Sequence, residues 1–226
     1  MTSGPVTCCF TPSIVLATPP TLNPAPASPR SIPNPPFLGV ILAGGRSRRM
    51  GRDKATTTLE GRTLFDWVYT ALSQVVPEVV VAGRQAIQGV RSIPDTLAGG
   101  RGPSAGIITG LMEAKGRSIL VVAVDQPWVR PATLAALLDV RPQPATPLDG
   151  RFQVTCSTYT PRCIPILEEA ARKEGSLQPV IPQLEGTAIP PEHWRSWGED
   201  GRSWFSVDTP GDLQEGRSRY GAPGAR

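Results

Sequence analysis

FLGVILAGG, at residues 37–45, is a continuous apolar run that ends in two glycines. An apolar run of this length indicates a strand buried on both faces, as in a parallel sheet covered by helices. The glycines at its end let backbone N–H groups approach a ligand because no Cβ stands in the way. The stretch therefore predicts the first strand of the folded domain and one edge of a site.

Segments with helical spacing alternate with further apolar runs along the chain. The pattern predicts strands at 79–82, 118–124 and 152–159, and a short last strand at 204–207. It predicts helices at 64–75, 103–114, 131–138 and 164–173, and a brief helix after residue 210. Residues 177–197 are ambiguous. This alternation predicts an α/β fold with three layers, α/β/α and Rossmann-like, around a mostly parallel sheet.

Composition divides the chain into three parts. Residues 1–36 are rich in Pro, Ser, Thr and Ala and carry a single charge, at Arg30. Because proline at this density blocks both helices and sheet ladders, we expect a disordered, partly polyproline-like tail. We expect one folded domain over residues 37–215 and a flexible C-terminal tail over residues 216–226.

The positive charge is concentrated in one loop. The formal net charge is +4. Between residues 46 and 54 one anion accompanies five cations, and the rest of the chain is balanced; the cations are Arg46, Arg48, Arg49, Arg52 and Lys54. Such a focus suits a polyanion the size of a triphosphate, whereas nucleic-acid binders spread basic residues along a face or helix. We expect a nucleotide ligand and no nucleic acid.

Several classes of protein are disfavoured by the remaining residues. The four cysteines, Cys8, Cys9, Cys156 and Cys163, form no CxxC pair, so neither a zinc site nor a disulfide scaffold is expected. No apolar run is long enough to predict a membrane span. The single histidine, His193, gives little support to nucleophilic catalysis. We expect a cytoplasmic protein that binds no membrane.

The loop at residues 42–54 has the composition of a phosphate cradle. Backbone N–H groups at Gly44 and Gly45 can form an anion nest. The guanidinium groups of Arg46 and Arg49 and the ammonium of Lys54 can then neutralise a triphosphate. The loop matches neither GxxxxGK[ST] nor GxGxxG. The alternative is a tight turn followed by a solvated basic loop.

Three aspartates stand where they can complete this site. Asp125 follows the strand predicted at 118–124, and Mg²⁺ prefers one or two carboxylates together with phosphate oxygens. Asp95 precedes a glycine-rich segment and can accept a hydrogen bond from a base or ribose, or lie behind a metal ion. Asp208 can be a second metal ligand or the cap of the last helix. Ligands of parallel sheets collect at the carboxyl ends of the strands, where these residues are expected.

The order and spacing of these motifs resemble those of the molybdenum cofactor guanylyltransferases, from about residue 38 to 215. The resemblance is carried by Leu42-Ala43-Gly44-Gly45, Arg49-Met50-Gly51, Asp53-Lys54, Asp95 with Gly102-Pro103-Ser104-Ala105-Gly106, Asp125-Gln126-Pro127 and Val207-Asp208-Thr209-Pro210. It implies a fold of the nucleotide-diphospho-sugar transferase type. It also implies transfer of GMP from GTP to molybdopterin carrying molybdenum, with release of pyrophosphate and with Mg²⁺ as cofactor.

The resemblance also implies roles for individual residues. Lys54 and Asp125 are the expected catalytic residues, and Asp125 is the expected metal ligand. The nucleotide is expected to contact Leu42, Ala43, Gly44, Gly45, Arg46, Arg49, Lys54, Asp95 and Asp125. The expected substrates are GTP and molybdopterin, and transient contact with proteins of molybdenum insertion or molybdoenzyme maturation is expected.

Departures from the family pattern leave two alternatives. Ala82-Gly83 stand where the family often has Asn, and Gln126 stands where a small residue is usual. One alternative is a cytidylyltransferase or a sugar-1-phosphate nucleotidylyltransferase of the same fold. The other is a non-catalytic accessory protein that binds a nucleotide.

Overall fold

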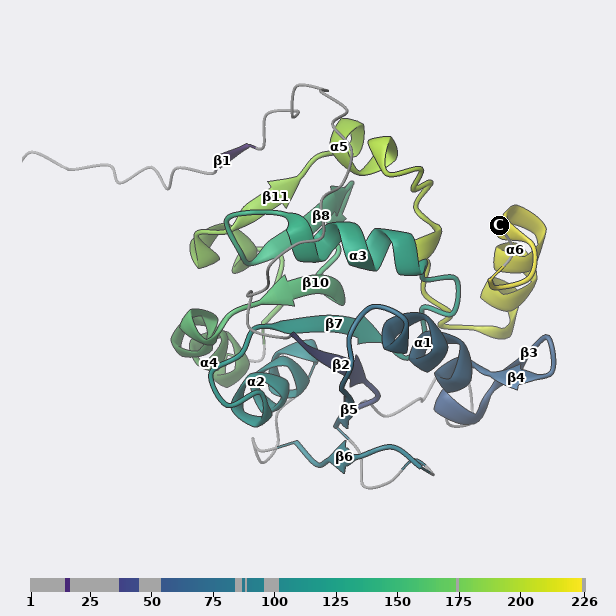
Figure 1. Cartoon of the computed structure of the whole chain (residues 1–226), viewed down its shortest axis with the longest axis horizontal. Coiled ribbons are helices and arrows are strands. Elements are labelled where there is room, and N and C mark those ends of the chain that lie inside the picture. The colour runs from purple at the N-terminus through teal and green to yellow at the C-terminus, as the bar shows by residue number, and fades with distance from the viewer. Residues whose placement is uncertain are drawn as a thin grey trace, which may run out of the picture.

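A central five-stranded sheet has the strand order β10-β7-β2-β5-β6 (Figure 1). The computed structural model describes residues 15–16, 37–44, 54–83, 87, 89–95, 102–173 and 175–224. The strands of the central sheet are β2 (Leu38–Leu42), β5 (Val79–Ala82), β6 (Ser92–Ile93), β7 (Ile119–Ala123) and β10 (Cys156–Tyr159). Only β10 runs antiparallel to its neighbour. The predicted mostly parallel sheet is therefore confirmed.

The middle strand, β2, is apolar on both faces. Leu38, Val40 and Leu42 pack into one hydrophobic cluster, and Ile41 packs into another on the opposite face. Gly39 leaves room for the end of the helix at residues 64–73 and the chain just after it, because an added Cβ would lie 3.0 Å from Cδ2 of Leu72 and 2.7 Å from Cγ2 of Val76. All five residues of this strand are buried, as expected for a strand whose sheet is covered on both faces.

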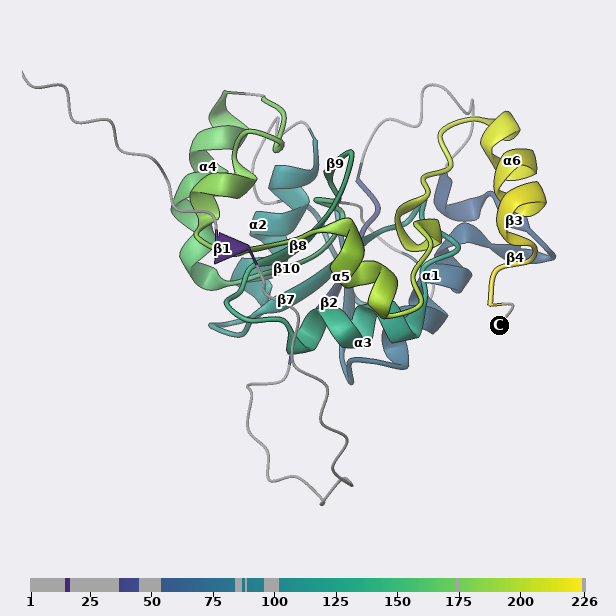
Figure 2. The same cartoon turned by 90° about the horizontal axis from the view of Figure 1, so that it is seen from above.

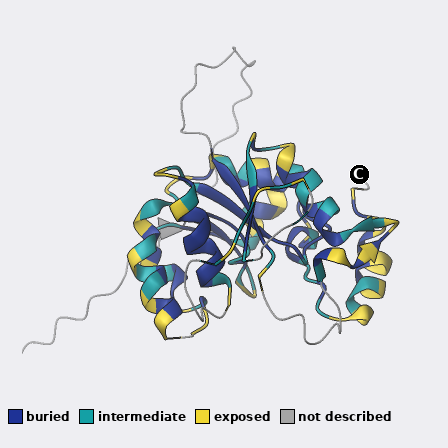
Figure 3. Ribbon diagram, turned by 90° about the horizontal axis from the view of Figure 1, so that it is seen from below, coloured by how far each residue is buried: buried dark blue, intermediate teal, exposed yellow. Residues whose placement is uncertain are grey.

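Helices cover the two faces of the sheet as predicted. In Figures 1 and 2, α1 (Leu64–Ser73) and α3 (Pro131–Asp139) lie on one face, and α2 (Pro103–Glu113) and α4 (Ile164–Arg172) lie on the other. The buried strands run between these layers in Figure 3. The three-layer α/β/α prediction is confirmed. None of the described helices has the length and apolar character needed to cross a membrane.

A second sheet, with the order β1-β11-β8-β9, was not predicted. Its strands are β1 (Val15–Leu16), β8 (Ala145–Asp149), β9 (Arg151–Phe152) and β11 (Thr187–Ile189). The single strand predicted at 152–159 is wrong in extent: β9 ends at Phe152 and β10 begins at Cys156, because a turn intervenes. Gln153 still pairs with β8, since its N donates to Pro147 O at 2.8 Å. The turn is closed by a bond of 2.9 Å from Cys156 N to Gln153 O.

The second sheet contains two residues of the predicted N-terminal tail. Val15 and Leu16 form β1 and pair with β11. The other residues of 1–36 lie outside the described residues, so their disorder stays a prediction. Cys8 and Cys9 lie there too, whereas Cys156 and Cys163 are buried free thiols.

The strand predicted at 204–207 is wrong. Residues 202–204 form a 3-10 turn, η4 (Arg202–Trp204), and residues 205–207 belong to no strand. The chain turns here because the buried carboxylate of Glu199 accepts backbone N–H bonds from Gly201 at 2.8 Å and Ser203 at 3.2 Å. The helix that follows, α6 (Pro210–Tyr220), continues past the expected domain end at residue 215. It does so because Tyr220 packs with Trp128 in a small core.

Short elements complete the described structure. A two-stranded hairpin pairs β3 with β4 just before α1. The short elements are η1 (Lys54–Thr56), β3 (Thr58–Leu59), β4 (Arg62–Thr63), η2 (Pro161–Cys163), η3 (Ile181–Leu184) and α5 (Pro191–Ser196). Of these, η1 matters most for function because it carries Lys54.

Candidate active site

The candidate site lies at the carboxyl ends of β2, β5 and β7. Backbone bonds tie these ends together: Ala43 N donates to Ala82 O at 3.0 Å, and Val124 N donates to Leu42 O at 3.0 Å. The next residue after Val124 is Asp125. The strand ends that the sequence predicts to meet are therefore neighbours in the structure.

Lys54 joins two carboxylates at this edge. Its Nζ donates to Oδ2 of Asp125 at 2.8 Å and to Oδ1 of Asp208 at 2.6 Å. The side chains of Lys54 and Asp125 are 17% and 21% exposed, whereas that of Asp208 is 51% exposed. A backbone bond of 2.8 Å from Val207 N to Asp125 O brings Asp208 beside Asp125. We call these three residues the Lys54 cluster.

Burial and charge act in opposite directions on the Lys54 cluster. Burial alone lowers the pKa of Lys54, but attraction to Asp125 and Asp208 outweighs it, so the pKa is raised. Burial raises the pKa of Asp125, and the neighbouring Lys54 ammonium acts against that rise. Lys54 is therefore a cation at neutral pH.

Asp95 lies against the glycines at the ends of β2 and β5. A Cβ added to Gly44 would lie 3.4 Å from Oδ2 of Asp95, and one added to Gly83 would lie 3.4 Å from Oδ1. Oδ1 is buried and has no hydrogen-bond partner in the described structure. Burial raises the pKa of Asp95. An unpaired buried acceptor is costly, so this oxygen is available to a donor on a ligand.

The α2 helix approaches the same strand ends closely. Its N-cap is Gly102, with φ 89°, and Pro103 occupies the first turn. A Cβ on Gly106 would lie 2.7 Å from Cδ2 of Leu42, so only glycine lets the helix pack this near the strand. The segment Gly102–Gly106 therefore begins a helix that packs closely against β2.

The structure brings most of the predicted site residues to one edge. These are Leu42, Ala43, Gly44, Lys54, Asp95 and Asp125. Gly45, Arg46 and Arg49 lie outside the described residues. The roles expected of those three residues stay predictions.

Comparison with known proteins identifies the family. Residues 39–187 match the model of the MobA-like NTP transferase domain. The chain belongs to this family. It is 33% identical, over 79% of this chain and 91% of the relative, to a probable molybdenum cofactor guanylyltransferase of Pelotomaculum thermopropionicum. It is 39% identical, over 60% of this chain and 64% of the relative, to the molybdenum cofactor guanylyltransferase of Rhizobium leguminosarum bv. trifolii.

Solved structures agree with this assignment. Molybdopterin-guanine dinucleotide biosynthesis protein A from Archaeoglobus fulgidus superposes with a TM-score of 0.67 at 26% identity, over 80% of this chain and 97% of that chain. The 2-C-methyl-D-erythritol 4-phosphate cytidylyltransferase from Thermus thermophilus has a TM-score of 0.59 at 20% identity, over 80% and 98% of the two chains. The second likeness shows the fold alone. This MobA-like chain is a nucleotidyltransferase with the predicted fold.

Asp212 is a site residue that the sequence reasoning missed. Its Oδ2 accepts from the backbone N–H groups of Asp208 and Thr209, each at 2.7 Å. Thr209 is the N-cap of α6, so Asp208 is not the helix cap. The signal was present in the sequence, since Thr209-Pro210-Gly211-Asp212 has the spacing of a capping box with an acidic third residue. The Asp208 side chain takes no part in this cap and accepts a hydrogen bond from Lys54.

Gln126, a departure from the family pattern, has a structural role. Its side chain is buried, accepts from Ala123 N at 3.2 Å and donates to Oγ1 of Thr155 at 3.1 Å. These bonds fix the turn after β7 against the start of β10. Gln126 therefore supports the position of Asp125.

The tryptophans form core and not an aromatic ligand pocket. Trp128, Trp194 and Trp204 are buried, and Trp197 packs against the cluster that contains the last two. His193 lies on α5 and contacts the Trp197 ring edge-on, at 5.4 Å between centroids. The absence of a catalytic role for His193 stays a prediction.

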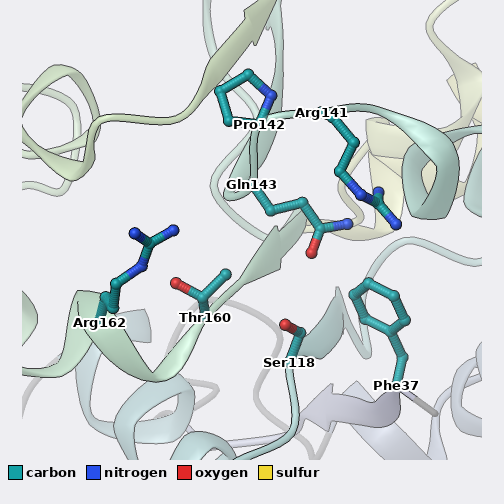
Figure 4. A pocket seen from close by; sticks show the side chains of 7 residues that line it. All are labelled: Phe37, Ser118, Arg141, Pro142, Gln143, Thr160 and Arg162. Atoms are coloured by element: carbon teal, nitrogen blue, oxygen red, sulfur yellow. The ribbon is translucent and has the colours of Figure 1, made fainter. Parts of the chain in front are cut away.

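A separate pocket lies away from the candidate site. It has a volume of about 510 Å³ and lies at the opposite edge of the sheet, where β2 and β7 begin and β10 ends (Figure 4). Its lining residues are Phe37, Ser118, Arg141, Pro142, Gln143, Thr160 and Arg162. None of the predicted site residues lines it.

Proposed function

We propose that this nucleotidyltransferase transfers GMP from GTP to the terminal phosphate of molybdopterin carrying molybdenum and releases pyrophosphate. The Lys54 cluster, placed beside the glycine-lined ends of β2 and β5, is the observation that carries the proposal. The names of relatives at 33% and 39% identity support the choice of substrates.

The reaction needs no covalent enzyme intermediate. An oxygen of the acceptor phosphate attacks the α-phosphorus of GTP in line, a new P–O bond forms, and the bond to the bridging oxygen breaks as pyrophosphate leaves. Catalysis is then positioning together with neutralisation of charge. Lys54 balances negative charge on the leaving pyrophosphate, and we assign the same role to Arg46 and Arg49.

The nucleotide binds, in this proposal, along Leu42, Ala43, Gly44 and Gly45. Of these, Gly44 and Gly45 would offer backbone N–H groups to the phosphates because glycine presents no side chain, whereas Ala43 N already donates to Ala82 O. Asp95 offers the unpaired Oδ1 to donors of the base or ribose. The N–H donors of guanine and the hydroxyl groups of ribose can both bond to this oxygen, so Asp95 fits a nucleoside triphosphate such as GTP.

Mg²⁺ is the metal cofactor that we propose. Asp125 and Asp208 fit such an ion, because their oxygens converge on one point, now occupied by Lys54 Nζ at 2.8 and 2.6 Å. Mg²⁺ takes one or two carboxylates together with phosphate oxygens. Asp125 would be the principal ligand and Asp208 the second. When bound, the ion supplies Lewis-acid neutralisation of the phosphates.

The remaining parts of the proposal concern the cellular setting. We assign the enzyme to the cytoplasm, where GTP and molybdopterin are its substrates. Transient contact with proteins of molybdenum insertion or molybdoenzyme maturation would deliver the acceptor or receive the product. Apart from Val15 and Leu16, which pair with β11, the Pro-rich segment 1–36 is proposed as a tail outside the catalytic domain. The C-terminal tail, expected over residues 216–226, is proposed to begin only after α6.

Cytidylyl transfer is the second candidate, favoured by one observation. Gly83 has no side chain to contact a base, and an added Cβ would lie 2.6 Å from Gly44 Cα. Calorimetric titration of the full chain with GTP, CTP and ATP, each with Mg²⁺, separates the candidates. We expect GTP to bind at least about tenfold more tightly than CTP, or about 1.4 kcal/mol. Equal binding, or tighter binding of CTP, would contradict GTP as the substrate.

A non-catalytic role is tested by a different readout. Release of pyrophosphate from GTP, dependent on molybdenum-molybdopterin, is expected of the enzyme. GTP binding without pyrophosphate release would instead support an accessory protein that binds a nucleotide.

A further inference from the structure

Lys54 occupies the position that a metal ion would need between Asp125 and Asp208. Its Nζ lies 2.8 Å from one carboxylate and 2.6 Å from the other. An ion with Mg–O distances of about 2.1 Å cannot bridge the same oxygens while the ammonium stays there. We propose that Lys54 excludes the divalent ion from the nucleotide-free enzyme, and that a bound triphosphate draws Lys54 away and so opens the metal site. This inference rests on the proposed nucleotide and metal site.

The ammonium satisfies the two carboxylates when no ligand is bound. Asp125 is largely buried, and a buried carboxylate without a cation is strongly disfavoured. Lys54 supplies that cation through two charge-assisted hydrogen bonds. A free divalent ion would have to break both bonds and hold Lys54 close to a second positive charge. The ion alone should therefore bind weakly.

A triphosphate changes this balance because it offers Lys54 new acceptors. Lys54 begins η1 and directly follows the basic sequence of residues 46–53. Its flexible four-carbon stem lets the ammonium move from carboxylate to phosphate without rearrangement of the sheet. The carboxylates are then released to the ion, which also gains phosphate oxygens. Nucleotide and metal should therefore bind with positive and reciprocal coupling.

The carboxylates are held by contacts that do not involve Lys54. Asp125 O accepts from Val207 N at 2.8 Å, and Asp208 N donates to Asp212 Oδ2 at 2.7 Å. Replacement of Lys54 should therefore leave both aspartates in place. Lys54→Met keeps much of the apolar stem and removes the charge, so it isolates the proposed effect.

The test measures Mn²⁺ binding to the full chain by calorimetry and by electron paramagnetic resonance. Without nucleotide, we expect Lys54→Met to bind Mn²⁺ at least about tenfold more tightly than the unsubstituted protein. The matched control is Lys173→Met, which removes a surface lysine paired with Glu169 at 2.9 Å and should bind Mn²⁺ as the unsubstituted protein does. A non-hydrolysable GTP analogue should raise the Mn²⁺ affinity of the unsubstituted protein more than that of Lys54→Met.

Two results would overturn the inference. One is a folded Lys54→Met protein, checked by circular dichroism, that binds Mn²⁺ no more tightly than the unsubstituted protein. The other needs no variant: equal Mn²⁺ affinity of the unsubstituted protein with and without the GTP analogue. If Mn²⁺ and the GTP analogue bind with coupling but the chain forms no dinucleotide product, the inference is supported and the proposed function is contradicted. Uncoupled binding in an active enzyme overturns the inference alone.

Discussion

A Cβ added to Gly83 would lie 2.6 Å from the Cα of Gly44. These two glycines follow β5 and β2, and their backbones meet at the floor of the candidate site. Gly83 also has φ 93° and donates its N–H to Ile93 O at 3.0 Å. The close approach and the positive φ together explain why this chain has glycine at position 83.

Gly83→Ala should destabilise the protein by about 2–4 kcal/mol, since a positive φ costs an alanine about 1–2 kcal/mol and the backbone overlap adds to it. Urea denaturation measures the loss. The control is Gly61→Ala, because Gly61 also has a positive φ, 75°, but nothing lies within 4 Å of its added Cβ. We expect the control to lose only about 1–2 kcal/mol. Equal losses in the two variants would contradict the close packing of Gly83 on Gly44.

The α6 helix, which follows Asp208, is seated on Trp128 through Gly216. An added Cβ on Gly216 would overlap the indole ring, whose Nε1 donates to Gly221 O at 2.9 Å. Gly216→Ala should therefore displace the helix and destabilise the protein by about 1–3 kcal/mol. In the same helix Gly211 is exposed, and its added Cβ meets only Thr209 Oγ1 at 3.5 Å. Gly211→Ala should change the stability by no more than about 0.5 kcal/mol, as thermal denaturation would reveal.

The two aspartates of the Lys54 cluster should differ in their effect on turnover. Asp125→Asn should lower kcat at least about 100-fold, or about 2.7 kcal/mol, because it removes the negative charge of the principal, largely buried metal ligand. Asp208→Asn should cost less, about tenfold, because Asp208 is the second ligand and its side chain is 51% exposed. Steady-state pyrophosphate release at saturating Mg²⁺ measures both. The exposed Asp139→Asn is the control and should retain full turnover. Turnover of Asp125→Asn within about tenfold of the unsubstituted enzyme would refute the assignment.

Asp95 gives a prediction for pH. Burial raises its folded-state pKa above the unfolded value, so its contribution to stability is present at acid pH and is lost as the pH rises through the raised pKa. Asp95→Asn should therefore raise the Tm of the nucleotide-free protein at pH 7 by about 1–3 °C, a small figure because the group is partly exposed. The gain should shrink on acidification towards pH 4.

The same variant should bind GTP more weakly. Differential scanning fluorimetry at several pH values, with and without GTP, measures both effects. A pH-independent change in Tm, together with an unchanged shift on addition of GTP, would remove Asp95 from the nucleotide site.

The parts of the fold that could be predicted are those with strong local patterns. β2, β5 and β7 are apolar on both faces, and α1 to α4 have clear helical spacing. β8 could not be predicted because it contains Pro147, which cannot donate to a ladder, and β11 is only three residues long. The strand predicted at 204–207 failed because the carboxylate of Glu199 turns the chain through its bonds to Gly201 N and Ser203 N, and the apolar pattern of 204–207 carries no sign of that buried carboxylate.

The candidate site was predicted in the same uneven way. Lys54 and Asp125 stand in motifs with a chemical reason for their residue types. The two motifs could be expected to meet, since Gly44-Gly45 and Asp125 each follow a strand of the parallel sheet. The contact of Lys54 with Asp208 spans 154 positions of sequence and depends on the Asp212 cap and the docking of α6 on Trp128. No local pattern predicts such a contact.

The most direct test of the central claim is formation of the dinucleotide product. The full chain would be incubated with Mg²⁺, molybdenum-molybdopterin and either GTP or CTP, labelled at the α-phosphate, and the labelled product would be measured beside the pyrophosphate. We predict equimolar product and pyrophosphate from GTP, formed at least about tenfold faster than from CTP. Equal or faster product formation from CTP, or no labelled molybdopterin product from GTP, would contradict the account.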